Sequence, residues 1–294
     1  MYGSGVLHRI FVAVLAAVHG VGAPSQPEGP LARPAPPPLI YPADVDTGPF
    51  RRPLTAASYI AIDLKAGTVL MAKGSRTRRP IASLTKVMTG VLAAEAGDPN
   101  HLIRVPRAAT QVEPNRDDLV AGRHYTRRLL EHSALMISAN DSAYALGWDI
   151  GGKSIGRFYN LMNDAASQLG MSDTHYGSAN GLDDVHNWSS ARDQALVARY
   201  ALADATFRKI VGRRTMRVRW AAPVHLKVYR NHNRMLFSYG GTYGVKTGFT
   251  TRAGACLVVA VHRGGHDVLA VLLDSKGIWA DMPRLVGAAL RRAS

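Results

Sequence analysis

The sequence predicts an α+β protein in which helices flank an antiparallel sheet. Two observations lead to this prediction: strand-like runs open the globular part of the chain and return in its last third, and helical patterns dominate the middle. Strands from both ends are expected to form one sheet that the helices cover. With 294 residues, of which 47% are hydrophobic, the chain is long enough to bury a core. We expect one large domain, or one domain with a subdomain.

Residues 1–53 are expected to precede the folded domain. Residues 1–23 place His8 and Arg9 ahead of a short apolar run and end in small residues, a pattern typical of a secretory signal peptide. The run is shorter than the ~20 residues that span a bilayer, so a retained anchor is the weaker alternative. Residues 24–53 are rich in proline and lack apolar periodicity, which indicates an extended linker.

The first predicted elements of the folded domain are two strands and a series of helices. Residues 58–64 and 68–72 are apolar runs separated by the turn signal Ala66-Gly67, which is typical of a hairpin. Several helical patterns follow, some opened by a Ser or Thr suited to an N-cap. We expect helices over residues 83–96, 126–147, 154–169 and 189–203.

The chain then returns to strands. They are expected over residues 217–222, 243–248, 253–262 and 266–274, with Arg263-Gly264-Gly265 as the turn between the last two. A final amphipathic helix is expected from about residue 278 to 292.

The chain is strongly basic. Its formal net charge of +15 arises from 36 Lys and Arg against 21 Asp and Glu, and basic pairs occur along the whole length. In an exported protein this charge favours attraction to anionic wall polymers or to phospholipid headgroups. Ordinary solvated faces are the alternative. A nucleic-acid partner is not expected, because no binding motif and no interleaved aromatic residues accompany the charges.

Neither metal nor thiol chemistry is indicated. Cys256 is the only cysteine and lies in an apolar run, so no intramolecular disulfide can form and a buried, unreactive thiol is expected. The 11 histidines are scattered without the spacing of metal ligands.

Three short strings indicate a serine acyl-transfer site: Ser83-Leu84-Thr85-Lys86, Ser138-Ala139-Asn140 and Lys246-Thr247-Gly248. A serine hydroxyl needs a base within hydrogen-bond reach. If a helix begins near Ser83, Lys86 lies one turn away on the same face. Lysine is a base only when uncharged, and the helix N-terminus, the cation of Lys246 and burial all lower its pKa.

The other two strings suit substrate binding and proton transfer. The hydroxyl of Ser138 and the amide of Asn140 can relay a proton and bind a substrate amide, although a helix cap is the structural alternative. The ammonium and hydroxyl of Lys246 and Thr247 can bind a carboxylate, and Gly248 lets a substrate backbone approach. The N–H groups of Phe249 and Ser83 are candidates for an oxyanion hole.

From about Leu54 onward, the chain resembles the low-molecular-mass penicillin-binding proteins that act as serine D-alanyl-D-alanine carboxypeptidases, the S11 peptidase family. Beyond the three strings, the similar segments are residues 81–89, 180–184, 188–193, 231–236 and 244–250. The resemblance implies a β-lactamase/transpeptidase-like fold, with a five-stranded antiparallel sheet and an inserted, mostly helical subdomain. It also implies a catalytic domain over residues 54–294.

The roles that the resemblance implies follow the three strings: a nucleophile and its general base at Ser83 and Lys86, a proton relay at Ser138 and Asn140, and attraction of the substrate carboxylate at Lys246 with Thr247. The implied hydrolase removes the terminal D-Ala from peptidoglycan stem peptides ending in D-Ala-D-Ala, through an acyl-enzyme. Penicillins and other β-lactams would acylate Ser83, and no metal or organic cofactor is implied. Such an enzyme acts in peptidoglycan biosynthesis and cell shape, outside the cytoplasm.

Two positions depart from the family pattern. Members often carry His directly after K-T-G and Arg inside N-x-N, where this chain has Phe249 and His232. Carboxylate binding would then rest more on Lys246, or vary with pH through His232. Two alternative functions share the strings: a β-lactamase and a non-catalytic penicillin-binding wall sensor. Ala139 replaces the Asp usual in β-lactamases, and the complete reactive set argues against a pure binder.

Overall fold

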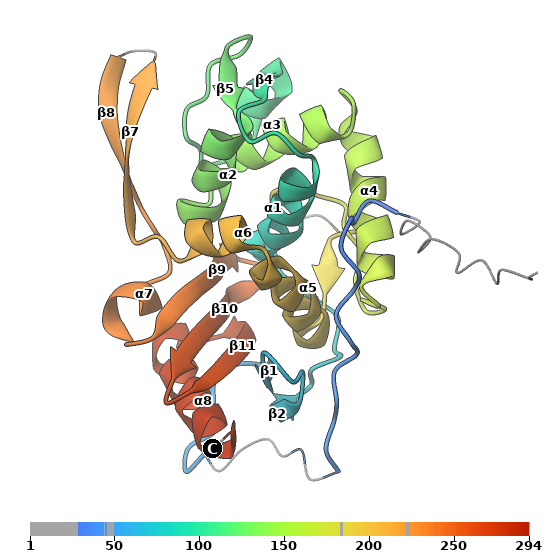
Figure 1. The fold of residues 1–294 in the computed structure, drawn as a ribbon, viewed down its shortest axis with the longest axis vertical. Helices are drawn as coiled ribbons and strands as arrows, with labels where there is room; N and C mark the ends of the chain where they lie inside the picture. Colours follow the sequence, from blue (N-terminus) through green and yellow to red (C-terminus); the bar gives the residue numbers. More distant parts are fainter. Residues whose placement is uncertain (1–28, 44, 46–49, 183–184, 222–223, 294) are drawn as a thin grey trace, which may run out of the picture.

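The computed structural model describes residues 29–43, 45, 50–182, 185–221 and 224–293. The expected signal peptide, residues 1–23, therefore lies outside the described residues, as does Asp183-Asp184 of one similar segment. Among the helices of the described ranges, none is both long and apolar enough to cross a membrane. Figure 1 shows a half built on a sheet and a half built of helices.

A five-stranded antiparallel sheet joins the two ends of the folded chain, as predicted. Its strands, in the order β2-β1-β11-β10-β9, are β1 (Ser58–Asp63), β2 (Val69–Lys73), β9 (Thr242–Thr250), β10 (Gly254–Arg263) and β11 (His266–Ser275). β1 pairs with β11, so that Ile60 lies opposite Val271. The middle of the sheet is completely buried, because helices cover both of its faces.

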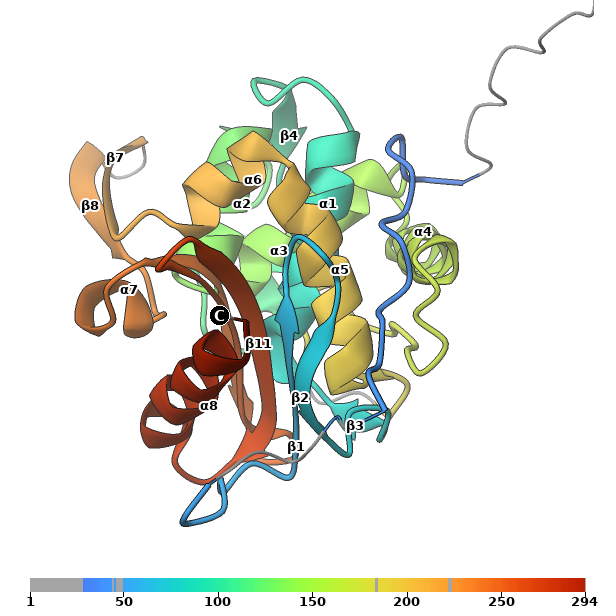
Figure 2. The same cartoon turned by 60° about the horizontal axis from the view of Figure 1, so that its bottom comes forward.

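Helix α8 (Ile278–Ala293) covers one face of the sheet, and α5 (Ala191–Ala203) lies on the other (Figure 2). The buried Asp281 of α8 fixes the start of β1, because its carboxylate accepts hydrogen bonds from the backbone N–H and hydroxyl of Thr55 and from the hydroxyl of Ser275. A buried carboxylate is tolerated when it is hydrogen-bonded in this way.

The helical half contains most of the helices, and side-chain caps begin several of them. Its elements are the 3-10 turns η1 (Ala82–Thr85) and η2 (Arg107–Gln111), the helices α1 (Lys86–Glu95), α2 (Arg127–Met136), α3 (Asn140–Ile150), α4 (Ile155–Gln168) and α6 (Ala205–Val211), and the short strands β3 (Arg79–Pro80), β4 (Leu102–Arg104), β5 (His124–Thr126) and β6 (Trp188–Ser189). The hydroxyls of Thr126, Ser154 and Ser190 accept N–H bonds from the first turns of α2, α4 and α5.

The single helix predicted over residues 126–147 is wrong, because two helices occupy this range. α2 ends at Met136 and α3 begins at Asn140. Between them Ser138 adopts a φ of 64°, and a left-handed residue cannot continue a right-handed helix. The break turns the Ser138 side chain out of the helix path.

Among the elements that were not predicted, two lie close to the end of the helical half. β8 (Val224–Arg230) pairs with β7 (Thr215–Ala221) in a separate hairpin, and α7 (Met235–Ser238) follows it. The hairpin stands out from the body beside α2 (Figure 1).

The described part of the proline-rich segment packs against the body of the protein. Leu31 and Leu39 are buried. Ile40 forms a bridge with Thr68 next to β2, and Arg199 of α5 donates to the carbonyl of Pro37 at 2.8 Å. Packed structure therefore extends upstream of residue 54, where the domain was expected to begin.

Glu131 of α2 gives a testable dependence of stability on pH. Its side chain is buried, and burial raises its pKa to about 7, although Arg127 opposes the shift. The folded state therefore holds the proton more tightly than the unfolded state, so this carboxyl destabilises the fold as pH rises from about 4 to about 7. We expect Glu131→Gln to raise the free energy of unfolding by about 2 kcal/mol at about pH 8 and by much less at about pH 5, measured by urea titration.

Glu113→Gln is the matched control, since Glu113 is exposed. It should leave the pH dependence of unfolding as in the wild type. Equal effects of the two substitutions at both pH values would contradict the role assigned to Glu131.

Candidate active site

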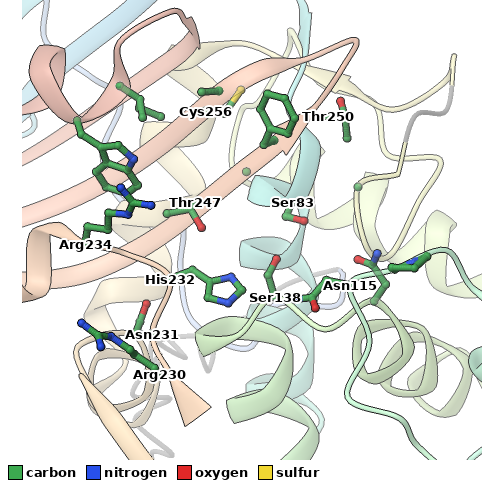
Figure 3. A pocket seen from close by; sticks show the side chains of 18 of the residues that line it. Ser83, Asn115, Ser138, Arg230, Asn231, His232, Arg234, Thr247, Thr250 and Cys256 are labelled. Carbon is green, nitrogen blue, oxygen red and sulfur yellow. The ribbon is translucent and has the colours of Figure 1, made fainter.

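A cavity of about 1180 Å³ lies where the two halves meet (Figure 3). η1, the break between α2 and α3, strand β9 and the segment around α7 all contribute to its walls. Seven of the nine residues predicted for the site line it directly: Ser83, Ser138, Asn140, His232, Thr247, Gly248 and Phe249. The other two, Lys86 and Lys246, are fully buried behind the wall. The fold thus brings all three sequence strings to one place.

Strand β9 holds η1, and with it Ser83, at close range. A Cβ atom added to Gly248 would lie 3.0 Å from the backbone nitrogen of Ser83 and 3.1 Å from the carbonyl oxygen of Ile81. A side chain at this position would push the two backbones apart by a few tenths of an ångström. Gly248 therefore favours their close approach, in addition to any role in substrate binding.

Lys86 begins α1 and its Nζ atom has three oxygen neighbours. Ser83 Oγ lies 2.8 Å away, Asn140 Oδ1 2.7 Å away and the carbonyl oxygen of Asn180 2.6 Å away. An uncharged amine has two N–H bonds and one lone pair. When it donates to Asn140 and to the Asn180 carbonyl, its lone pair remains for the hydroxyl proton of Ser83. The geometry is that of a general base next to its nucleophile.

The surroundings of Lys86 favour this uncharged form. Burial lowers its pKa well below the ordinary 10.5, and the positive charge of Lys246 lowers it further, while Asp141 opposes both effects. A desolvated ammonium group loses the hydration that stabilises it in water. The amine is therefore available as a base much closer to neutral pH than an exposed lysine would be.

Lys246 of β9 connects the third string to the second. Its Nζ donates to Ser138 Oγ at 2.9 Å and to the carbonyl of Thr247 at 2.9 Å. Burial lowers the pKa of Lys246 to about 7. Figure 3 shows Ser83 and Ser138 at the same part of the cavity, with Thr247 and His232 beside them.

Asn140 is oriented by its surroundings. Its amide nitrogen donates to the carbonyl of Glu113 at 2.9 Å, which leaves Oδ1 to face Lys86. The neighbouring Asp141 accepts N–H bonds from Asp117 and Leu119, and so holds the loop that carries Glu113 against α3. Asp141 is thus a structural anchor.

Asn180 was not predicted as a site residue. Its carbonyl oxygen accepts from Lys86, and the next residue, Gly181, has a φ of 81° and lies so near Ala82 that an added Cβ would be 1.9 Å from the Ala82 carbonyl oxygen. The dipeptide Asn180-Gly181 signals a turn, but no side-chain pattern reveals where a backbone carbonyl points. The arginines Arg230 and Arg234 also line the cavity and were missed.

His232 and Phe249, the two departures from the family pattern, are both exposed on the cavity wall. Desolvation by the surrounding wall and the charges of Lys246 and Lys86 lower the pKa of His232 below 6.5. The imidazole is therefore neutral at neutral pH and becomes charged only in acid. The Phe249 side chain is 71% exposed, which is unusual for a large apolar group.

The remaining candidates for reactive chemistry are accounted for. Burial raises the pKa of Cys256 to about 12, so the group stays a thiol and is a poor nucleophile. Within the part of the chain that the structure describes, no three His, Cys, Asp or Glu side chains gather where they could hold a metal ion.

Comparisons with known proteins agree on one family. The family model for D-alanyl-D-alanine carboxypeptidases, peptidase family S11, matches residues 46–277. The chain is 31% identical over 240 residues to a D-alanyl-D-alanine carboxypeptidase of Streptomyces sp. (strain K15), covering 76% of this chain and 82% of that protein. It is 30% identical over 220 residues to D-alanyl-D-alanine carboxypeptidase DacB2 of Mycobacterium tuberculosis, covering 74% of each.

Solved structures agree with these relatives. The crystal structure of the Streptomyces K15 DD-transpeptidase has a TM-score of 0.76 at 29% identity, over 83% of this chain and 98% of that one. The D-alanyl-D-alanine carboxypeptidase of Mycobacterium tuberculosis has a TM-score of 0.73 at 29% identity, over 80% and 88% of the two chains. The β-lactamase/transpeptidase-like fold expected from the sequence is confirmed.

Asn140→Asp tests whether Lys86 acts as an uncharged base. A carboxylate 2.7 Å from Nζ favours the ammonium form and raises the pKa of Lys86. We expect the acylation rate of Ser83 by a β-lactam to fall about tenfold or more at neutral pH, and to recover as pH rises, because one pKa unit changes the uncharged fraction tenfold. Rates across pH are read by mass spectrometry of the covalent adduct.

Asn115→Asp is the matched control, because Asn115 also lines the cavity but has no contact with Lys86. It should shift the profile far less. An Asn140→Asp profile that coincides with the wild-type profile would show that the charge of Lys86 does not limit acylation.

Proposed function

The chain belongs to the S11 family of D-alanyl-D-alanine carboxypeptidases, and from this we propose that Ser83 is the residue that carries the acyl group during removal of the terminal D-alanine. The enzyme is a serine hydrolase of peptidoglycan metabolism. The observation that carries the assignment is the contact of Ser83 Oγ with the buried Lys86 amine at 2.8 Å. The two other neighbours of that amine are acceptors, which supports the direction of proton transfer from hydroxyl to amine.

In the proposed acylation step, Ser83 transfers its proton to Lys86 Nζ as Oγ forms a bond to the carbonyl carbon of the penultimate D-alanine. The bond from that carbon to the leaving nitrogen then breaks, and the nitrogen takes a proton from the hydroxyl of Ser138. The proton that Lys86 took from Ser83 passes in turn to Ser138, so that Ser138 is again a hydroxyl and Lys86 again an uncharged amine before deacylation. Ser138 already accepts a hydrogen bond from Lys246, so its own proton is available for donation. Asn140 serves the relay by keeping Lys86 in position.

In the proposed deacylation step, a water molecule takes the place of the serine hydroxyl as the nucleophile, and Lys86 again acts as the base. Lys86 takes a proton from a water molecule, the water oxygen bonds to the acyl carbon, and the bond to Ser83 Oγ breaks with return of the proton to the serine. The N–H groups of Ser83 and Phe249 would stabilise the negative oxygen in both steps. The close packing of β9 on η1 at Gly248 supports this pairing.

The substrate carboxylate is assigned to Lys246 and Thr247. Lys246 supplies a charge and Thr247, which lines the cavity, supplies a hydroxyl. Binding and catalysis then make opposite demands on two buried amines: Lys246 must be charged and Lys86 uncharged. The charge on Lys246 itself helps to keep Lys86 uncharged.

The substrate of the family is cell wall peptidoglycan, so the enzyme acts outside the cytoplasm. We propose that the signal-like residues 1–23 direct export, and that stem peptides ending in D-Ala-D-Ala and β-lactams compete for the same cavity. The basic surface supports an additional attraction to anionic material in that compartment.

Loss of Ser83 should abolish the reaction. We expect Ser83→Ala to release no D-alanine from a diacyl-D-Ala-D-Ala peptide and to form no adduct with penicillin, because no other group replaces its hydroxyl. The wild type should gain the mass of one penicillin, mapped to Ser83 by peptide mass spectrometry. Ser238→Ala is the control, since Ser238 lines the same cavity. An adduct on another residue would contradict the assignment.

The pKa of Lys246 predicts how binding depends on pH. Since free Lys246 loses its proton near a pKa of about 7, kcat/KM should fall as pH rises above that value. A bound carboxylate raises the pKa of Lys246 by attraction, so kcat should hold to higher pH than kcat/KM. Steady-state kinetics with the carboxylate substrate measure both profiles.

The same substrate ending in D-alanine amide is the control, because it offers no carboxylate and its kcat/KM should lack the alkaline limb. His232→Gln separates the contribution of the imidazole. It should change the profile only below about pH 6.5, where His232 gains charge. Identical alkaline limbs for acid and amide would exclude Lys246 as the carboxylate partner.

A further inference from the structure

The β7–β8 hairpin has one face attached to the body. On this inner face Val218, Trp220 and Tyr229 are buried. The Trp220 ring packs on Tyr125 at a centroid distance of 5.2 Å, and Lys227 reaches both Asp117 and the face of Trp220. The inner face therefore fixes the hairpin in place.

The outer face of the hairpin reverses the usual pattern of a half-buried strand. Val224, Leu226 and Val228 alternate along β8 and are 70%, 62% and 60% exposed. Solvent-facing positions of such strands are normally polar, and a cluster of exposed large apolar side chains marks an interaction surface. Nothing in the fold of the described residues covers this row.

Arginines stand beside the apolar row on the same outer face. Across the hairpin, Arg217 lies opposite Val228 and Arg219 lies opposite Leu226. Both arginines are exposed, and neither forms an ion pair with an acidic side chain among residues 29–43, 45, 50–182, 185–221 and 224–293. From residue 213 to 230 the sequence holds six Lys or Arg and no Asp or Glu. We call Arg217, Arg219, Val224, Leu226 and Val228 the outer face.

We propose that the outer face binds the surface of an anionic phospholipid bilayer. A basic, amphipathic element that lies in the headgroup region uses its apolar side chains for the acyl boundary and its cations for the phosphates. Arginine suits the second task, because its guanidinium pairs with phosphate in a bidentate geometry. A soluble polyanion would need only the arginines, whereas the exposed row of Val224, Leu226 and Val228 favours a partner with a hydrocarbon layer.

The position of the hairpin gives this binding a consequence for the cavity. β8 ends at Arg230, which lines the cavity wall together with His232 two residues further on, and the hairpin stands out from the body (Figure 1). A bilayer bound to the outer face would hold the cavity at a defined orientation to the membrane. The inference rests on the hairpin alone and is independent of the residue roles proposed above.

Co-sedimentation with vesicles tests the proposal. The wild-type chain should bind vesicles of equimolar phosphatidylglycerol and phosphatidylcholine, and bind pure phosphatidylcholine far less. Arg217→Gln with Arg219→Gln should weaken the binding to anionic vesicles about 25-fold, from about fivefold for each arginine. Leu226→Ser should weaken it about tenfold. Thermal unfolding of each variant confirms that the fold is intact.

Each variant has a matched control elsewhere on the surface. Lys65→Gln with Lys73→Gln removes the same charge from two exposed sites near β1 and β2, and Leu102→Ser removes a leucine side chain of β4 that is 58% exposed. The arginine, leucine and lysine variants leave residues 1–53 unchanged, so any membrane binding by that segment is common to them. The controls should bind vesicles nearly as well as the wild type.

Several outcomes would overturn the proposal. If the lysine pair and the arginine pair weaken vesicle binding equally, the binding depends on the net charge of the protein and not on the outer face. Unchanged vesicle binding of Leu226→Ser, together with arginine-dependent binding to soluble polyphosphate, would favour a polymer partner. A dimer in sedimentation that Leu226→Ser dissociates, without vesicle binding, would assign the outer face to a second copy of the chain.

Discussion

An amine kept out of water is the constraint on which this structure depends. Lys86 can accept a proton from Ser83 only where the ammonium form is costly, and the fold meets this condition by burying its Nζ between η1, α3 and the Asn180 turn. The free energy of that burial is tolerable because the neutral amine has a partner for every hydrogen and for its lone pair. The proposed role of Lys86 as a base therefore depends on the meeting of the sheet half and the helical half.

The second buried lysine makes the site a coupled pair. Lys246 and Lys86 reach the same cavity from β9 and α1, and neither has a carboxylate in direct contact. Each positive charge makes the other harder to hold, so the pair favours one proton rather than two. In the proposed mechanism, a substrate carboxylate attracts that proton to Lys246 and leaves Lys86 free to act as a base. Substrate binding and activation of the nucleophile would then be linked through electrostatics.

Much of the architecture could be predicted because side-chain periodicity and caps are local signals. The strands of the sheet were predicted from side-chain periodicity, and Thr126 and Ser154 were recognised as residues suited to an N-cap. Ser83 and Lys86 were paired because a spacing of three residues places them on one helical turn. The break at Ser138 could not be predicted, since its positive φ is imposed by contacts with distant segments. The Asn180 carbonyl has no side-chain signal at all. β8 was missed because Val224, Leu226 and Val228 turn their apolar side outward, against the usual pattern.

The packed proline-rich segment contributes to holding the two halves of the protein together. Its residues contact Gln168 at the end of α4 and Tyr200 of α5 at one end, and pair with the β1–β2 turn through Ile40 at the other. The segment therefore connects helices α4 and α5 to the β1–β2 turn of the sheet. The segment reaches the sheet at the β2 edge, whereas the cavity is lined by β9 at the opposite edge. Residues outside the predicted domain therefore help to hold the two halves together from the side away from Ser83.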